Sequence, residues 1–561
     1  MSQYPKAEDA DVIHLESRGD AGKGQPDASH KSPDSAKKTK GGGGGRRVLR
    51  GRDKAAQFLK EADLPPIVVT PNDNKRVLRK IDLHILPFIL IVYCLQSLDK
   101  TALSYASVFG IIEDTHLVGE QFSWLSSVVY VTQLVFQPLI AYGLVKFPVG
   151  KFCSVMVLCW GAVLCAMTAA HDFGGLMASR LLLGTFEASV APSFIAIVQM
   201  WYRRREQTLR NASWYAMLGV VNMVGSLLSY GLGHIKSSVL RPYQIIFLFC
   251  GGITVLFSIV MFLFMPDSPL EAKFLDKHEK LVAVERLRMN QMGISSGVWK
   301  WDHVWESMLD PKTWLWFSLM LAISGGISTF GPLIVQSFGF EPFIAIIFYI
   351  PFGFVELVAI LFGAWLSDRI RMKSVVLLLL SLPPIVGTVM LLVTGRGPGD
   401  RAVLLTGFYI VSVYPAISPL ILSWAGQNTA GDTKRKMTTA VLFVGSSVGN
   451  IVGPQLFKPS ESPRYDRGLR ASLALFVVVA VLVIVGMMWI KILNRRHAAT
   501  RKAMGKAEVI RDISMMGDKQ RAAAAAADQD DGFLNQGEER IGDKAFEDVT
   551  DLRNEEFIFV L

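Results

Sequence analysis

Four ionisable residues interrupt apolar stretches that are long enough to cross a membrane. Asp99 and Lys100 stand together in one stretch, and Arg180 and Glu187 stand in another. Charged side chains at membrane depth are costly. They usually face a cavity, pair with one another and mark the path of an ion or a substrate. Glu187 follows Arg180 by seven residues, so on a helix the two share a face and lie about 10 Å apart along the axis.

Two simpler interpretations of these charges stay open. Asp99 and Lys100 can lie at a helix end, with the Lys100 side chain extending to the membrane surface. Arg180 and Glu187 can form a buried salt bridge that only supports the fold. Counting helical rise from the expected points of membrane entry places Asp99, Lys100 and Arg180 at a similar depth and Glu187 nearer the middle. The four side chains can therefore line one cavity.

The rest of the sequence predicts a polytopic membrane protein. Of its 561 residues, 51% are hydrophobic and 19% are charged, which is too apolar for a soluble globular protein. Five cysteines fall in apolar runs, and no spacing typical of zinc or haem ligands occurs, so we expect no disulfide framework, metal or cofactor. The sequence shows no nucleophile paired with a base, so we do not expect an enzyme. Stretches of about 17–25 residues are expected to span as twelve helices: residues 83–106, 121–143, 152–170, 174–200, 209–234, 243–265, 313–336, 342–366, 373–394, 402–425, 437–457 and 469–492.

Lysine and arginine gather in alternate loops, which by the positive-inside rule places both termini and the basic loops in the cytoplasm. The net charge of +10 follows from this distribution and indicates no nucleic-acid partner. A long loop divides the spans six and six, as in transporters built from two repeated halves with a site between them. The expected division is a disordered cytoplasmic tail at residues 1–79, six-helix halves at 80–265 and 313–494, a cytoplasmic linker at 266–312 and a second disordered tail at 495–561.

Two loops at matching places in these halves carry similar sequences, GLVKFPVGK from residue 143 and AWLSDRIRMK from residue 364. Both resemble the G-x-L-x-D-R-x-G-R/K loop of the major facilitator superfamily, although the first lacks the Asp and the second lacks the glycines. In a gate latch, the Asp contacts bases on a neighbouring helix and holds one conformer. The alternative is an ordinary pair of basic loops. The candidate gate residues are Gly143, Gly150, Lys151, Asp368 and Arg369, together with Glu206 and Arg210.

Longer motifs resemble the anion:cation symporter family within that superfamily. The stretch RLLLGTFEASVAP at residues 180–192 resembles the family's fourth-helix signature. Leu98-Asp99-Lys100 resembles its first helix, where Asp-Arg is common. Further motifs resemble the fungal allantoate permease branch: PDSP at residues 266–269, Trp424 with NTAG at 428–431, and Gly449-Asn450 with GPQ at 453–455.

This resemblance implies an all-α membrane protein of the major facilitator fold, with twelve transmembrane helices in two six-helix halves. It also implies proton-coupled transport of a small organic anion. The carboxylates of Asp99 and Glu187 would carry protons, and Lys100 and Arg180 would bind the substrate. Arginine suits a carboxylate because it binds it through two hydrogen bonds, whereas Lys100 would act as a point charge.

Four other polar residues are weaker candidates. Tyr130, Asn222 and Asn428 are candidate substrate contacts and Glu356 is a candidate proton site, although polar side chains in membrane helices often only join helices. We expect a monomeric importer in a fungal plasma membrane, with a small organic anion, protons and membrane lipid as partners. An exporter of a secondary metabolite on the same scaffold and a non-transporting nutrient receptor remain alternatives.

Overall fold

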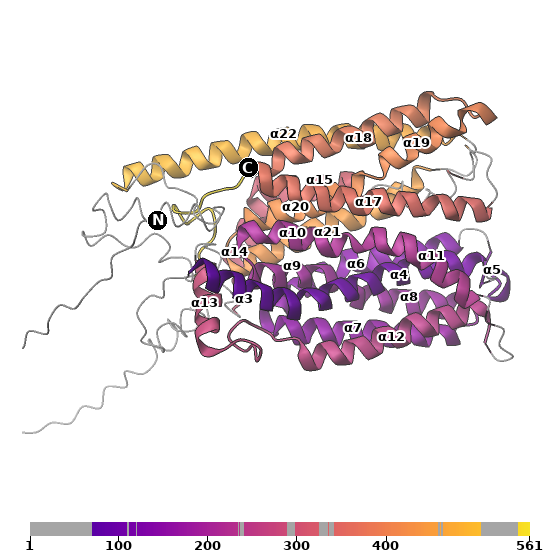
Figure 1. Ribbon diagram of the computed structural model, residues 1–561, viewed down its shortest axis with the longest axis horizontal. Helices are drawn as coiled ribbons and strands as arrows, with labels where there is room; N and C mark the ends of the chain where they lie inside the picture. The colour runs from indigo at the N-terminus through magenta and orange to yellow at the C-terminus, as the bar shows by residue number, and fades with distance from the viewer. Residues whose placement is uncertain are drawn as a thin grey trace, which may run out of the picture. The chain divides into compact units, whose positions relative to one another are not determined.

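The computed structural model describes residues 70–108, 111–118, 121–233, 235, 240–288, 298–324, 335, 342–457, 461, 464–506 and 548–561 (Figure 1). Regular structure within these residues is helical, and they include no strand. In this part of the chain, nine helices are long and apolar enough to cross a membrane. The expected all-α membrane architecture is therefore confirmed.

The first six expected spans are all helical where the structure describes them, but two of them are divided. The break in the fourth span falls directly after Glu187, and the break in the fifth falls at Ala216. The helices are α4 (Leu86–Val108), α6 (Gln121–Lys146), α7 (Val149–Ala166), α8 (Phe173–Glu187) with α9 (Val190–Trp201), α10 (Arg204–Tyr215) with α11 (Met217–Gly233), and α12 (Pro242–Phe264). They are accompanied by α3 (Pro71–His84), α5 (Ile111–Asp114) and η1 (Met167–Ala169).

The last six spans follow two shorter helices, α13 (Lys277–Arg288) and α14 (Trp301–Leu309). The tenth span is divided, and the seventh is described only in its first part. The helices are α15 (Pro311–Ile323), α17 (Pro342–Ile370), α18 (Lys373–Val393), α19 (Arg401–Val411) with η3 (Tyr414–Ala416) and α20 (Ile417–Gln427), α21 (Asp432–Gln455) and α22 (Asp466–Ala503), with η2 (Pro398–Asp400) before α19.

Capping residues set the start of several helices. Asp172 accepts a hydrogen bond from the backbone N–H of Gly175 at 3.0 Å, where α8 begins. Asp310 does the same for Lys312 at 3.0 Å, with Pro311 as the first residue of α15. Such bonds satisfy backbone donors that have no partner inside the helix. Both caps also fix the direction of a helix that carries a buried charge discussed below.

The two halves approach each other closely where α11 and α17 cross. A Cβ atom added to Gly219 would lie 2.5 Å from the carbonyl oxygen of Gly353, and one added to Gly353 would lie 2.7 Å from that of Gly219. Small residues permit such backbone contact between membrane helices. The halves also meet where α6 packs on α21 and α10 packs on α20.

Helix α13 of the expected linker packs against α3. Glu279 accepts from Lys80 Nζ at 2.7 Å and lies 3.0 Å from Arg76 Nε. Burial raises the pKa of Glu279, but Lys80, the Asp276 backbone N–H and Arg76 outweigh it and lower the pKa below its ordinary value. We term the end of the bundle that carries α3 and α13 the tail end.

Parts of both expected disordered tails are structured. Helix α3 begins at Pro71, inside the expected tail at 1–79, while residues 1–69 lie outside the described residues. Helix α22 continues past residue 494, and its 38 residues rise roughly 57 Å, beyond a hydrocarbon layer of about 30 Å. Residues 548–561, termed the C-terminal strap, lie against the tail end (Figure 1). The side chains of Phe557 and Phe559 are buried. The expectation of a disordered C-terminal tail therefore fails for residues 495–503 and for the strap.

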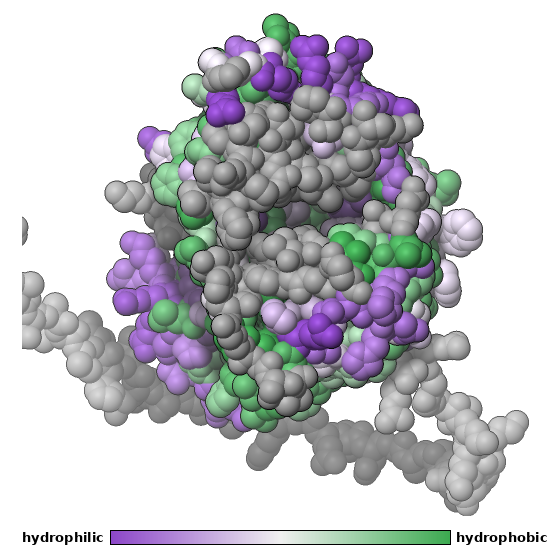
Figure 2. Space-filling view, turned by 90° about the vertical axis from the view of Figure 1, so that its right-hand side faces the viewer, coloured by the Kyte–Doolittle hydropathy of each residue, from purple (hydrophilic) through white to green (hydrophobic). Residues whose placement is uncertain are grey.

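The end of the bundle opposite the tail end carries hydrophilic side chains along its rim (Figure 2). One contact on this side is an ion pair between Arg241 Nη1, at the start of α12, and Asp114 Oδ1 of α5, at 2.7 Å. Polar groups at helix ends are typical of helices that emerge from the hydrocarbon layer into water.

Candidate functional site

The structure brings the four buried charges together from α4 and α8. Lys100 Nζ lies 3.0 Å from Oε1 of Glu187, and the amide of Gln96 donates to the same oxygen at 2.9 Å. Glu187 is almost fully buried, whereas 38% of the Lys100 side chain is exposed. Lys100 thus turns toward a buried carboxylate, and it lies eight residues before the end of α4 and not at a helix end.

Asp99 faces a different neighbour, because consecutive residues of a helix point about 100° apart. The indole Nε1 of Trp160, on α7, donates to Asp99 Oδ2 at 2.8 Å. Both side chains are buried, and Asp99 Oδ1 has no hydrogen-bond partner within the described residues. The carboxyl group of Asp99 therefore holds one neutral donor and one free acceptor position.

Arg180 is the least satisfied member of the four. Only 3% of the residue is exposed, and its Nε and Nη2 atoms lack hydrogen-bond partners in the part of the chain that the structure describes. Arg180 nevertheless interacts electrostatically with Asp99 and Glu187. Since a buried donor without a partner is costly, this guanidinium presents open hydrogen-bond capacity toward an anion. A closed salt bridge between Arg180 and Glu187 is not found among the described ion pairs.

Aromatic and amide side chains extend this cluster toward the second half. Lys100 Nζ lies 6.0 Å from the centre of the Tyr130 ring, within the range of a cation–π contact. Across the interface, Asn222 of α11 donates to Oε2 of the buried Glu356 of α17 at 2.9 Å. Tyr215 lies between these pairs and interacts electrostatically with both Lys100 and Glu356. Tyr130, Asn222 and Glu356 are thus within one region.

Three members of this region were not among the sequence candidates. Gln96 lies four residues before Lys100, so the periodicity of a helix would have placed it on the same face. Trp160 and Tyr215 lie in other helices, and nothing in their local sequence indicates a charged neighbour.

Asn428 lies apart from this region, at the tail end. Its Nδ2 donates to the carbonyl oxygens of Trp424 and Val560, each at 2.9 Å, and its Oδ1 accepts from the Val560 backbone N–H at 2.7 Å. The side chain is fully buried and its amide is satisfied by the chain itself. The geometry therefore gives no support to Asn428 as a substrate contact.

Asp267, three residues after the end of α12, contacts the first loop of the candidate gate. Asp267 accepts from the Lys151 backbone N–H at 2.9 Å and lies 3.5 Å from Lys151 Nζ. A Cβ added to Gly150 would lie 2.9 Å from Asp267 Oδ1, and one added to Gly143 would lie 2.9 Å from the Phe152 ring. Asp267 thus brings a carboxylate to the Gly150–Lys151 end of this loop, whose motif position for Asp holds Phe147.

The other gate candidates also lie at the tail end. Arg210 binds Asp82 of α3 through Nη2 at 2.6 Å and Nε at 3.2 Å, and Glu206 pairs with Arg286 of α13. Asp368, near the end of α17, interacts electrostatically with Arg210 across the two halves. The next residue, Arg369, is exposed. These two pairs therefore join α10 of the first half to α3 and to α13 of the linker.

Comparison with known proteins identifies the family. Residues 89–454 match the model described as Major Facilitator Superfamily. The chain belongs to the major facilitator superfamily. It is 36% identical over 434 residues to the uncharacterized transporter C757.13 of Schizosaccharomyces pombe, covering 76% of this chain and 82% of that protein. It is 29% identical over 448 residues to the allantoate permease of Saccharomyces cerevisiae, covering 77% of this chain and 81% of that protein.

The fold agrees with this assignment. The proton:xylose symporter XylE matches with a TM-score of 0.54 and 14% sequence identity, over 73% of this chain and 95% of that chain. The predicted major facilitator fold of twelve membrane helices and the predicted likeness to the fungal allantoate permease branch are confirmed. The superfamily and these relatives are transporters, as the lack of an enzyme motif predicted.

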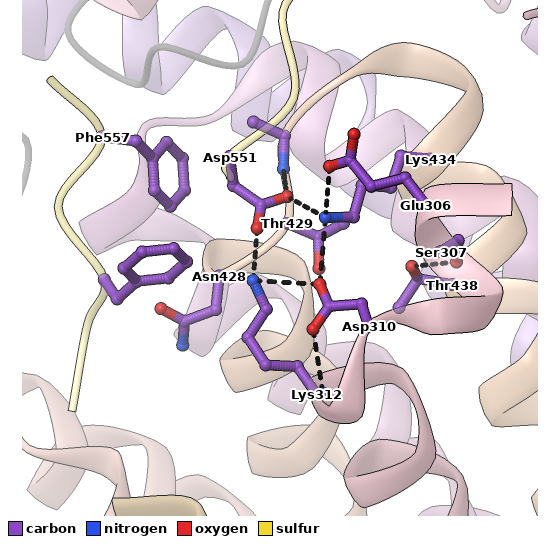
Figure 3. Close-up of polar contacts among 12 residues, drawn as sticks. Glu306, Ser307, Asp310, Lys312, Asn428, Thr429, Lys434, Thr438, Asp551 and Phe557 are labelled. Atoms are coloured by element: carbon purple, nitrogen blue, oxygen red, sulfur yellow. Dashed lines mark hydrogen bonds and ion pairs between the residues drawn. The ribbon is translucent and has the colours of Figure 1, made fainter. Parts of the chain in front are cut away.

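The sequence did not predict a second cluster of charged residues, which Figure 3 shows. Asp551 of the C-terminal strap pairs with Lys312, and its Oδ1 lies 3.0 Å from Lys434 Nζ. Lys434 also lies 3.0 Å from Asp310 Oδ2 and from Glu306 Oε1. Burial raises the pKa of Asp551, but the two ammonium groups outweigh it and hold the pKa at about 2. The strap is thus anchored by a fully ionised carboxylate.

Proposed function

We propose that this protein imports a small organic anion together with protons by alternating access. The observation that carries the proposal is the buried Arg180, whose unsatisfied guanidinium lies beside the Lys100–Glu187 pair. A carboxylate fits an arginine through two parallel hydrogen bonds, and it would satisfy donors that have no described partner. The likeness to a protein named allantoate permease supports an organic anion as the substrate class.

Charge balance links the anion to a proton. Asp99, Lys100, Arg180 and Glu187 together carry no net charge when all four are ionised, so one bound carboxylate adds a single negative charge. Protonation of one site carboxylate restores neutrality, which a low-dielectric site strongly favours. In this mechanism the anion binds Arg180 and attracts Lys100, Glu187 loses its cation, and Glu187 takes up a proton. Asp99, held by Trp160, is the second proton carrier.

Tyr130 of α6 and Asn222 of α11, both in the first half, complete the proposed binding region. Tyr130 adjoins Lys100, and Asn222 contacts Glu356. Glu356 is proposed as a further proton site, because its described hydrogen bond is to a neutral amide. Asn428 is not included in the proposed binding region.

The tail end is proposed to face the cytoplasm. The basic run Arg203 to Arg205 and the run Lys434 to Lys436 both begin helices at this end, in line with the positive-inside rule. Alternating access then requires contacts at this end that break and re-form. We propose this role for the Asp267 contact with the loop of Gly143, Gly150 and Lys151, and for Asp368, Arg369, Glu206 and Arg210. The proposed setting is a monomer in the plasma membrane.

The experiment that tests the proposal is uptake of radiolabelled carboxylates, allantoate among them, into proteoliposomes with an imposed proton gradient. Arg180→Ala is expected to weaken substrate binding roughly tenfold to a hundredfold, since a hydrogen bond to a charged group contributes about 1.5–3 kcal/mol. Arg180→Lys should recover only part of the loss, because lysine cannot bind in two places at once. Arg495→Ala, an exposed arginine on α22, is the matched control.

Several results would overturn the proposal. Unchanged uptake by Arg180→Ala would remove the anion site. Accumulation only in the outward direction would show an exporter. Absence of transport for every carboxylate, combined with saturable binding, would indicate a receptor.

A further inference from the structure

The C-terminal strap is bound to the second half and the loop before it by side chains that hold its backbone. Val560 exchanges two hydrogen bonds with the Asn428 side chain, and its carbonyl oxygen also accepts from Trp424 Nε1 at 2.9 Å. Phe559 exchanges two more with Asn494 of α22, both at 2.9 Å. These paired bonds hold the backbone of the strap, much as a sheet edge holds the backbone of an added strand.

Asp551 provides the electrostatic anchor of the same segment. In addition to Lys312 and Lys434, the Ala430 backbone N–H donates to its Oδ1 at 3.1 Å. Lys312 and Lys434 are almost completely buried (Figure 3). Buried ammonium groups need a counter-charge, so the site is built to receive an acidic side chain.

Arg204, at the start of α10, contacts the strap from the first half. Its Nη1 donates to the Ile558 carbonyl oxygen at 3.1 Å, and its guanidinium lies 4.3 Å from the centre of the Phe557 ring. Arg204 also reaches the second half directly, since its carbonyl oxygen accepts from Gln427 Nε2 at 2.6 Å. Arg204 is thus a common partner of the strap and of α20.

These contacts join the strap to both halves. The second half holds Asp551, Phe559 and Val560, and it also holds the Phe557 carbonyl oxygen, which lies 3.2 Å from Nδ1 of His497 on α22. The Phe557 ring and the Ile558 carbonyl oxygen contact Arg204 of the first half. When halves of a transporter rock as rigid bodies, the strap moves with the second half and its Arg204 contacts must break.

We propose that the tail-end surface is a docking site for the chain's own C-terminal strap, and that the docked strap holds the tail end closed by joining the two halves at Arg204. This goes beyond the substrate proposal, because it needs only the rocking of two halves and holds whatever the cargo is. The strap acts as a latch carried by one half and engaged by the other.

Hydrogen exchange measured by mass spectrometry on the full-length protein in nanodiscs tests this latch. Asp551→Asn should speed exchange at least twofold both in residues 548–561 and at the start of α10, residues 202–208. Phe557→Ala should speed exchange at residues 202–208 while residues 428–434, around the anchor, stay unchanged. Leu552→Ala alters the exposed neighbour of Asp551 and is the matched control.

A second arm tests the docking site directly. A fluorescent peptide of residues 548–561 should bind the Asp551→Asn protein, whose own strap is loosened, and the same peptide carrying Asp551→Asn should bind at least tenfold more weakly. Equal binding of the two peptides would overturn the assigned anchor. Faster exchange confined to residues 548–561 in both variants would show a passive appendage and overturn the latch.

Discussion

Lys100 and Glu187 are joined at 3.0 Å although one side chain is partly exposed and the other is buried. The buried partner depends on the exposed one for its counter-charge. Truncation of one member of a fully buried ion pair costs about 3–5 kcal/mol when the other keeps its charge, and the exposure of Lys100 makes the cost smaller here. The pair can therefore be tested as a unit.

Lys100→Met is expected to lower the unfolding temperature of the purified protein and to abolish carboxylate uptake. The double variant Lys100→Met with Glu187→Gln should recover most of the thermal stability but not the uptake, since no charge is left unpaired. Thermal unfolding in detergent measures the first effect. A double variant less stable than the single one would contradict the role of the pair.

Glu187→Gln alone should separate the two fluxes. A neutral amide cannot carry a proton, so accumulation driven by a proton gradient is expected to fall to background. Counterflow exchange, which needs no net proton movement, should persist. Both assays use the same proteoliposomes, and equal loss in both would make Glu187 a structural residue.

Trp160→Phe removes the indole donor of Asp99 while keeping a ring of similar shape. Loss of a buried hydrogen bond to a charged group should cost about 1–3 kcal/mol of stability and slow transport. Trp489→Phe is the control, because Trp489 Nε1 is buried without a partner in the described part of the chain. Equal destabilisation by both changes would show that ring size, and not the bond to Asp99, is what matters.

The stability of the folded protein should fall as the pH drops below about 6.5, the ordinary pKa of histidine. His303 of α14 is buried, and burial lowers its pKa. The carboxylates that face it, Asp548, Asp302 and Glu306, raise the pKa, and Lys300 lowers it further. A base with a lowered pKa contributes its full stability to the folded state above its ordinary pKa, and this contribution is lost as the pH falls below it.

Thermal unfolding in detergent reports this change as a lower unfolding temperature at pH 5.5 than at pH 7.5. His303→Gln should flatten the curve. Asp551 adds no dependence in that window, since its pKa of about 2 keeps it ionised in the docked state. An unaltered curve in His303→Gln would assign the effect to another group.

The sequence predicted the fold and the central charges for one reason, which is that charge stands out against an apolar background. Asp99, Lys100, Arg180 and Glu187 could be found without knowing which helices touch. Trp160 could not, because an indole in an apolar run looks like core. Asp551 was hidden for the opposite reason, since an acid in a polar tail looks solvated until its buried lysines are placed.

Asn428 shows the limit of residue type as a guide. An amide in a membrane protein can bind a substrate or a backbone, and only the position of Val560 distinguishes these. The missing Asp of the first loop motif is a related case. Asp267 brings a carboxylate to the other end of this loop from another part of the chain, and no local pattern predicts that.

The contact between Gly219 and Gly353 has a mechanical consequence. Two backbones already in van der Waals contact cannot come closer, so the halves can turn about this point but cannot slide through it. In the proposed rocking of the halves, the crossing of α11 and α17 would be the fulcrum between the two ends of the bundle. A methyl group there would move the axis of rotation itself, and transport in both directions would slow together.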